Sequence, residues 1–155
     1  MARQSVQPVI EALIARVESL TPLVYPDLTY SCARGCLGRD SAAEWIESIE
    51  RRSRDVVVYI DQPPALTQAN APCHIDCGIC IAVAYRSDLA DDVRDVMTVD
   101  DTTQIISAII ARPDLWGDAD GVWPRGRPPA PVEVTDEDGQ TQLYVQLIPL
   151  TVWLH

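Results

Sequence analysis

The sequence predicts an α+β domain, a mainly antiparallel sheet with an N-terminal helix and a mid-chain helix packed on it. Apolar residues recur at helical spacing near the N-terminus and again in the middle of the chain. Other stretches alternate apolar and polar residues or are rich in β-branched residues, as strands are. Because the links between neighbouring strands are of hairpin length, we expect antiparallel pairing.

The first helix is predicted for residues 5–20. Ser5 can cap its N-terminus, Pro8 is tolerated in its first turn, and Pro22 follows its end. Its apolar residues form one helical stripe, consisting of Val6, Val9, Ile10, Leu13, Ile14, Val17 and Leu20.

Two less regular segments come next. Residues 22–40 combine short apolar pieces with two glycines, so we expect irregular structure or a short strand. Residues 41–53 predict a short helix, because Ser41 and Glu44 have the spacing of a capping box.

Two strands are predicted from different patterns. DVVVYID at residues 55–61 is β-branched and is closed by Gln-Pro-Pro. Residues 74–86 alternate, which assigns one face to Ile75, Cys77, Ile79, Ile81, Val83 and Tyr85.

Residues 87–113 turn helical, with one apolar stripe before the segment TVDDTT and another after it. That segment either divides the helix in two or only bends it. The acidic pairs Asp91–Asp92 and Asp100–Asp101 are expected in solvent at helix N-termini, where carboxylates are stabilised by the helix dipole.

Residues 113–131 are rich in Pro, Gly, Trp and Arg and predict a long loop. The remaining residues predict a hairpin with its turn at Asp138-Gly139. Pro149 lies in the second strand of this hairpin, where it implies a bulge or an edge position.

The length of 155 residues fits one domain spanning 1–155, and a hydrophobic content of 47% is enough for a packed core. The net charge of −11 makes the chain a poor candidate for gripping DNA, whose phosphates call for cations. We find no apolar run of membrane-spanning length and no features of a signal peptide, so we expect synthesis in a cytoplasm and no membrane partner.

The cysteine-rich stretch CHIDCGIC at residues 73–80 has the spacing of an iron–sulfur or metal motif. A strand places Cys77 and Cys80 on opposite faces about 10 Å apart. Thiolates bound to one zinc lie no more than about 4.6 Å from one another, so the two cannot share a metal. Cys32 and Cys36 can form a local disulfide, or bond a neighbouring chain, or contribute to a zinc site with Cys73 and His74.

Other motifs of catalysis are missing, and we predict neither an enzyme nor a bound cofactor. The loop nevertheless contains Trp116, Trp123, Arg125 and Arg127, residue types that dominate interface hot spots. They predict a subunit or partner interface. The alternative is that both Trp rings fold back over the domain's own core.

Several segments occur in an order that resembles the tail terminator (tail completion) proteins of tailed bacteriophages. An amphipathic helix like VIEALIARV comes first, followed by a short strand like DVVVYID and a long alternating strand like HIDCGICIAVAYRSD. An acidic helix, a D-L-W stretch and a last strand, QLYVQLIPLTVWLH, complete the order over nearly the whole chain. The predicted helix at 41–53, the cysteines and the proline-rich loop fall outside this pattern.

The resemblance implies a structural virion protein without catalytic activity. Such subunits form a ring, typically six-fold, that caps the tail tube and joins it to the head or neck. The partners implied are other copies of the chain, the tail tube protein and neck or connector proteins, with assembly in the host cytoplasm. DNA would pass through the ring lumen without specific binding, which suits an acidic surface.

Two alternatives stay open. A head–tail connector of the stopper or adaptor kind has much of the same layout. A small Cys-dependent metal-binding protein or enzyme would use Cys32, Cys36, Cys73 and Cys77.

Overall fold

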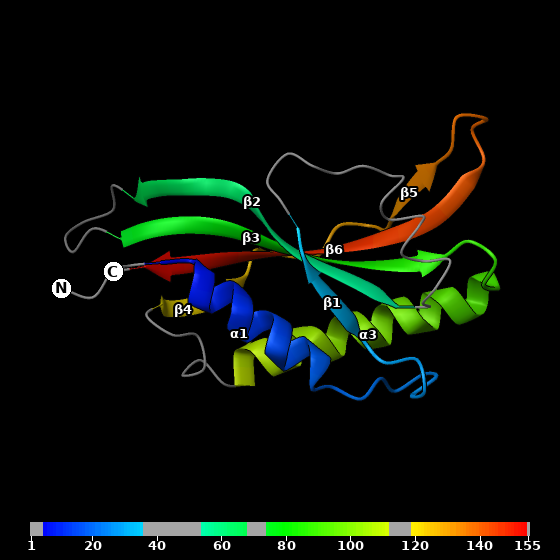
Figure 1. Cartoon of the computed structure of the whole chain (residues 1–155), viewed down its shortest axis with the longest axis horizontal. Helices are drawn as coiled ribbons and strands as arrows, with labels where there is room; N and C mark the ends of the chain where they lie inside the picture. Colours follow the sequence, from blue (N-terminus) through cyan, green and yellow to red (C-terminus); the bar gives the residue numbers. More distant parts are fainter. Residues whose placement is uncertain (1–4, 36–53, 68–73, 112–118, 155) are drawn as a thin grey trace.

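The computed structural model describes residues 5–35, 54–67, 74–111 and 119–154, and in these ranges two helices pack on one face of a six-stranded sheet (Figure 1). The helices are α1 (Gln7–Glu18) and α3 (Asp91–Ala111). The strands are β1 (Ser31–Arg34), β2 (Asp55–Thr67), β3 (His74–Arg86), β4 (Ala119–Pro124), β5 (Val132–Thr135) and β6 (Thr141–Leu154). The predicted α+β class is confirmed, while the helix predicted at 41–53 lies outside the described residues.

The sheet has the strand order β1-β2-β3-β6-β4, and β5 also pairs with β6. Among the described strands only β1 and β2 run parallel, and all other pairs are antiparallel. β3 and β6 form the centre, with a continuous register from Ile75–Leu154 to Arg86–Leu143. On its other side β6 pairs first with β5 and then with β4.

Pro149 lies where β6 changes partner, and its pairing with β3 is not interrupted. Its carbonyl accepts a hydrogen bond from the backbone nitrogen of Arg125 at 2.8 Å. The nitrogen of Pro149 therefore faces the same side, at the gap between β4 and β5, where no ladder bond is required. The expected bulge is absent from the β3–β6 register, and the edge-like position explains why proline is tolerated.

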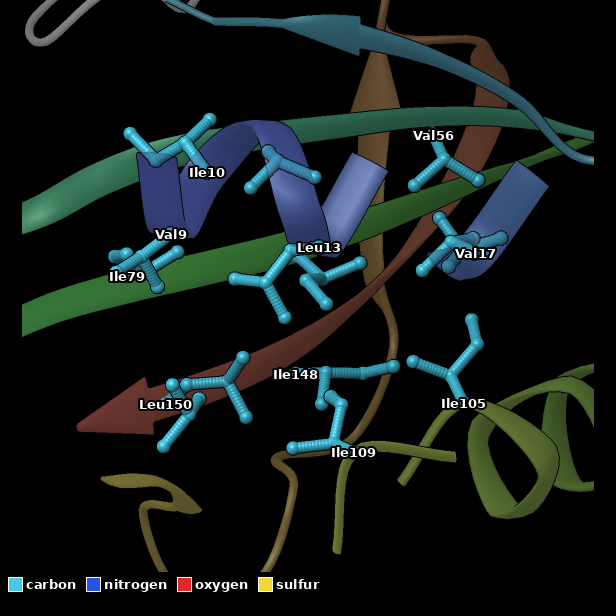
Figure 2. Close-up of a cluster of buried hydrophobic side chains, with 14 of the residues drawn as sticks. Val9, Ile10, Leu13, Val17, Val56, Ile79, Ile105, Ile109, Ile148 and Leu150 are labelled. Carbon is cyan, nitrogen blue, oxygen red and sulfur yellow. The ribbon is translucent and has the colours of Figure 1, made fainter. Parts of the chain in front are cut away.

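The main core lies between the helices and the sheet (Figure 2). The predicted face of β3 points toward the helices, and residues on alternate positions of β6 extend it. Helix α1 contributes four buried side chains, and α3 adds Met97, Ile105 and Ile109. Those of α1 are Val9, Ile10, Leu13 and Val17. Burial of each such side chain contributes about 1.5–3 kcal/mol to folding, which fixes both helices on one face.

Both helices differ in detail from their predicted form. Helix α1 starts at Gln7, and the Ser5 hydroxyl accepts a hydrogen bond from the Gln7 backbone nitrogen at 3.2 Å although Val6 occupies the N-cap. Helix α3 is a single helix of 21 residues, so TVDDTT does not divide it. The Thr98 and Thr103 hydroxyls donate to carbonyls four residues earlier, which satisfies both side chains inside the helix.

The predicted bounds of the first three strands agree with the structure to different degrees. β3 has the predicted bounds, 74–86, and the short strand left open within 22–40 is β1. The end predicted for β2 at Gln-Pro-Pro is wrong, because the strand continues to Thr67. Its register shifts on both sides of Gln62, and Pro63 and Pro64 fall in the second irregular stretch, where they need not donate to the ladder.

The long loop predicted for 113–131 is partly wrong, because it contains β4. Within β4, Val122 is buried and Trp123 is exposed, which is the alternation of a half-covered strand. The predicted hairpin is confirmed as β5–β6, with Gly139 at a φ of 78° in its turn. The Asp136 carboxylate accepts hydrogen bonds from the backbone nitrogens of Asp138 and Gln140, both at 2.9 Å.

Candidate functional site

The described cysteines lie apart from one another. Cys77 belongs to the core under the helices, whereas Cys80 is buried on the other face of β3, as the alternation predicted. Cys32 lies in β1 as a free thiol, and its predicted disulfide partner Cys36 lies outside the described residues, as does Cys73. In the described part of the chain no group of His, Cys, Asp and Glu side chains is arranged to hold a metal ion.

Burial makes these thiols poor nucleophiles at neutral pH. It raises the pKa of Cys32 to about 12, with a smaller contribution from the Glu18 carboxylate. Burial likewise raises the pKa of Cys77 and of Cys80. Because the thiolate is the reactive and metal-binding form, all three behave as small apolar side chains.

A buried ionic network lies between α3 and the sheet. The carboxylate of Asp101 accepts from Arg54 Nε at 2.8 Å, from the Tyr85 hydroxyl at 2.8 Å and from the Tyr30 hydroxyl at 2.7 Å. The side chains of Arg54 and Asp101 have no exposed surface. The expectation that Asp100–Asp101 is a solvated pair at a helix N-terminus is therefore wrong for Asp101, which lies inside α3.

The same network fixes the chain between α1 and β1. Arg54 Nη1 donates to the carbonyls of Tyr25 and Leu28, at 2.9 and 2.8 Å, and Nη2 donates to the carbonyl of Val24. Tyr25 has a φ of 50°, a left-handed conformation that a non-glycine residue rarely adopts. The arginine holds this turn in place, which is a structural role.

The two tyrosines stay protonated and donate to Asp101. Burial, followed by the Asp101 charge, raises the pKa of Tyr30 and of Tyr85 far above the usual range. The Asp101 carboxylate thus accepts three hydrogen bonds from side chains inside the protein. The network binds α3 to the strands and to residues 24–30.

On the outer face of the sheet, away from the helices, an ion pair lies over Gly78. Arg125 Nη2 donates to both carboxylate oxygens of Asp61, at 2.9 and 3.0 Å, and to the carbonyl of Leu150 at 3.0 Å. A Cβ at position 78 would lie 2.6 Å from Asp61 Oδ1 and 3.0 Å from Arg125 Nη2. Glycine is required there because the ion pair occupies the space of a side chain.

Next to this ion pair lie two exposed indoles, the Trp123–Trp153 pair. Their ring centroids are 6.2 Å apart with planes tilted by 58°. Trp123 is 44% exposed and Trp153 is 40% exposed. A Cβ at Gly121 would lie 2.6 Å from Trp123 Nε1, so this glycine lets the indole lie close against β4.

A groove of about 450 Å³, the α3 groove, lies between α3 and residues 127–129. Thr98, Val99, Thr102, Thr103, Ile106 and Ser107 line it from the helix. Arg127, Pro128 and Pro129 line the opposite wall together with Gln146, whose side-chain amide donates to the carbonyl of Pro129 at 2.9 Å. Arg127 is exposed and forms no hydrogen bond or ion pair with any described residue.

The four residues predicted as an interface do not share one surface. Trp116 lies outside the described residues, and Trp123 belongs to the outer face of the sheet. Arg125 is used in the ion pair with Asp61, whereas Arg127 lines the α3 groove. The sequence did not indicate two further residues of these surfaces. Trp153, whose ring lies near that of Trp123, was predicted only as part of a strand, and Val99, which lines the α3 groove, lies in the polar segment TVDDTT.

No known protein-family model matches the sequence, and no curated protein is similar enough to be recognised as a relative. Neither described helix is long and apolar enough to cross a membrane.

Proposed function

We propose that this chain is a structural virion protein that forms a ring, typically six-fold, on the tail tube of a tailed bacteriophage. The ring caps the finished tube and gives the head or neck a surface to join. The observation that carries the proposal is the order of elements along the chain. Helix α1, strands β2 and β3, the acidic helix α3 and strand β6 lie in the order of the sequence segments that resemble tail terminator subunits.

The distribution of side chains supports the same proposal. The strongest buried polar constellation, centred on Asp101, is used for internal bonding, while apolar side chains are exposed in separate places. The α3 groove and the Trp123–Trp153 pair are surfaces of the kind that protein partners cover. The net charge of −11 suits a ring lumen through which DNA passes without adhesion.

Capping of tail tubes tests the proposal. Purified chain is added to tail tube protein during polymerisation, and tube lengths and ends are examined by negative-stain electron microscopy. The expected result is shorter tubes with a ring at one end. Binding to head connectors but not to tubes would favour the stopper or adaptor role, and binding to neither would contradict the proposal.

A further inference from the structure

The outward side of α3 is built like a contact surface. Val96, Val99, Thr103, Ile106 and Ile110 recur at alternating steps of three and four residues, the spacing of a helical seam. Val96 is 52% exposed, Val99 63% and Ile110 54%. Because these aliphatic side chains are exposed in a row on one side of the helix, their burial against another surface would be favourable.

The α3 groove adds a charge to this apolar line. Val99, Thr103 and Ile106 belong both to the seam and to the groove lining, and Arg127 stands on the facing wall. Because Arg127 has no partner among the described residues, its charge is available to a carboxylate of an occupant. The groove therefore fits an apolar group accompanied by an acidic one.

The outer face of the sheet presents that combination. Trp123 and Trp153 form an exposed aromatic pair, and Asp76 is in register with Trp153 in the neighbouring strand. Strand alternation places Asp76 on the same face, because Cys77 belongs to the core under the helices. The Asp76 side chain is half-buried, and its buried Oδ1 has no hydrogen-bond partner among the described residues, whereas the Asp61 charge is already used by Arg125.

We propose that the α3 groove of one copy receives the Trp123–Trp153 pair of a second copy, so that subunits join head to tail. The inference rests on the proposed ring and deepens it by naming the contact. The groove lies beside α3 and the indoles lie on the outer sheet face, so the contact joins two different patches. In such a heterologous contact each of the two copies keeps one unoccupied patch, so further copies can be added. The chain of subunits closes into a ring when the rotation between neighbours permits.

Charge favours this pairing of patches. Copies with a net charge of −11 repel one another at a distance, so a stable contact requires a cation where a carboxylate arrives. Arg127 against the half-buried Asp76 carboxylate supplies that match beside the indoles, and the indoles against Val99 and its seam neighbours supply the apolar area. Tryptophan is also one of the residue types most enriched in interface hot spots.

Two exposed-site variants test the contact, Val99→Asp in the groove and Trp123→Ala in the aromatic pair. Leu23→Asp is the matched control, because Leu23 is 69% exposed and belongs to neither patch. Molar masses are measured by size-exclusion chromatography with light scattering, and circular dichroism melts check that each variant is folded. The expected result is a ring for the native chain and the control, and a monomer for each of the two variants.

Mixing the two variants gives the sharper result. Val99→Asp keeps an intact aromatic pair and Trp123→Ala keeps an intact groove, so one good contact forms and cannot be extended. We expect a dimer containing one of each. Arg127→Glu should raise the concentration needed for assembly several-fold, with a smaller difference at high salt.

Three outcomes would overturn the inference. Rings that survive both variants would remove this contact while leaving the proposed ring intact. Dimers of Trp123→Ala alone, lost in Val99→Asp, would mean that α3 pairs with α3 of a second copy across a two-fold axis. A native chain that stays monomeric would contradict both the contact and the proposed function.

Discussion

The two faces of the sheet come from the same strands but are built in different ways. Toward the helices, β3 and β6 present large aliphatic side chains that α1 and α3 cover completely. On the outer face β3 has only small residues at its centre, Gly78, Cys80, Ala82 and Ala84, and a smaller buried cluster forms around the two alanines. This face also carries the Asp61–Arg125 ion pair and the Trp123–Trp153 pair.

Under the proposed function, this difference separates residues that stabilise the fold from residues that serve assembly. Side chains buried between two layers contribute the largest free energies of folding and are set by internal packing. Among the described residues no helix covers the outer face, so its aromatic side chains are accessible to a partner. Mutations on the helix face should therefore mainly change the free energy of unfolding, and mutations at exposed positions of the outer face should mainly change assembly.

The largest loss of stability is expected for Asp101→Ala. Removing this carboxylate leaves Arg54 charged and buried without its partner, which costs about 3–5 kcal/mol of unfolding free energy. Urea denaturation measures the change, and Asp95→Ala is the control because Asp95 is exposed on the same helix. A loss below about 1 kcal/mol for Asp101→Ala would show that the network is not the main tie between α3 and the sheet.

Substitutions at two neighbouring residues of β6 compare how much each face contributes to the free energy of unfolding. Ile148 is fully buried toward the helices, and Leu147 is half-buried on the outer face. Ile148→Ala should cost about 3 kcal/mol, because it opens a cavity in the packed core, and Leu147→Ala clearly less. Equal losses in urea denaturation would mean that the outer face is as tightly packed as the helix face.

Gly78→Ala tests the space beneath the ion pair. The new methyl group would lie 2.6 Å from the Cβ of Gln62 and from Asp61 Oδ1, so strand and carboxylate must both shift. We expect a loss of about 2 kcal/mol, and a smaller one in an Arg125→Met background, where the overlying side chain carries no charge. An identical loss in both backgrounds would assign the cost to the contact with the Cβ of Gln62 in β2.

The last prediction concerns alkaline pH. The pKa of Cys32 is raised from 9.0 to about 12 in the folded protein, so the folded state holds its proton more tightly than the unfolded chain. The resulting stability is complete below pH 9 and is lost as pH rises toward 12. Cys32→Ser should make unfolding free energy fall less steeply across this range. An unchanged slope would contradict the protonated thiol.

Regular elements with a clear period were predicted well from the sequence. The bounds of β3 were found because six apolar residues alternate without a break, and the outcome for Cys77 and Cys80 followed from the same alternation. The extent of α3 was left open because polar residues interrupt the stripe. In the structure the helix continues, and the Thr98 and Thr103 hydroxyls bond to carbonyls of the preceding turn. A hydropathy pattern gives no information about such bonds.

Features that depend on distant partners were not predictable. Arg54 and Asp101 are 47 residues apart in the chain, and nothing local to either one indicates the pair. Arg125 looked like an exposed contact residue because its partner Asp61 lies 64 residues earlier. β4 was missed because Gly121 and Pro124 suggest a loop, whereas pairing with β6 and burial of Val122 outweigh that local preference.

Native mass spectrometry of the purified chain, without reductant or chelator, measures directly whether the protein forms a ring. We expect a closed oligomer of one defined size, typically six copies, with no metal bound. A monomer that carries stoichiometric zinc or iron would contradict it and would favour the Cys-dependent alternative.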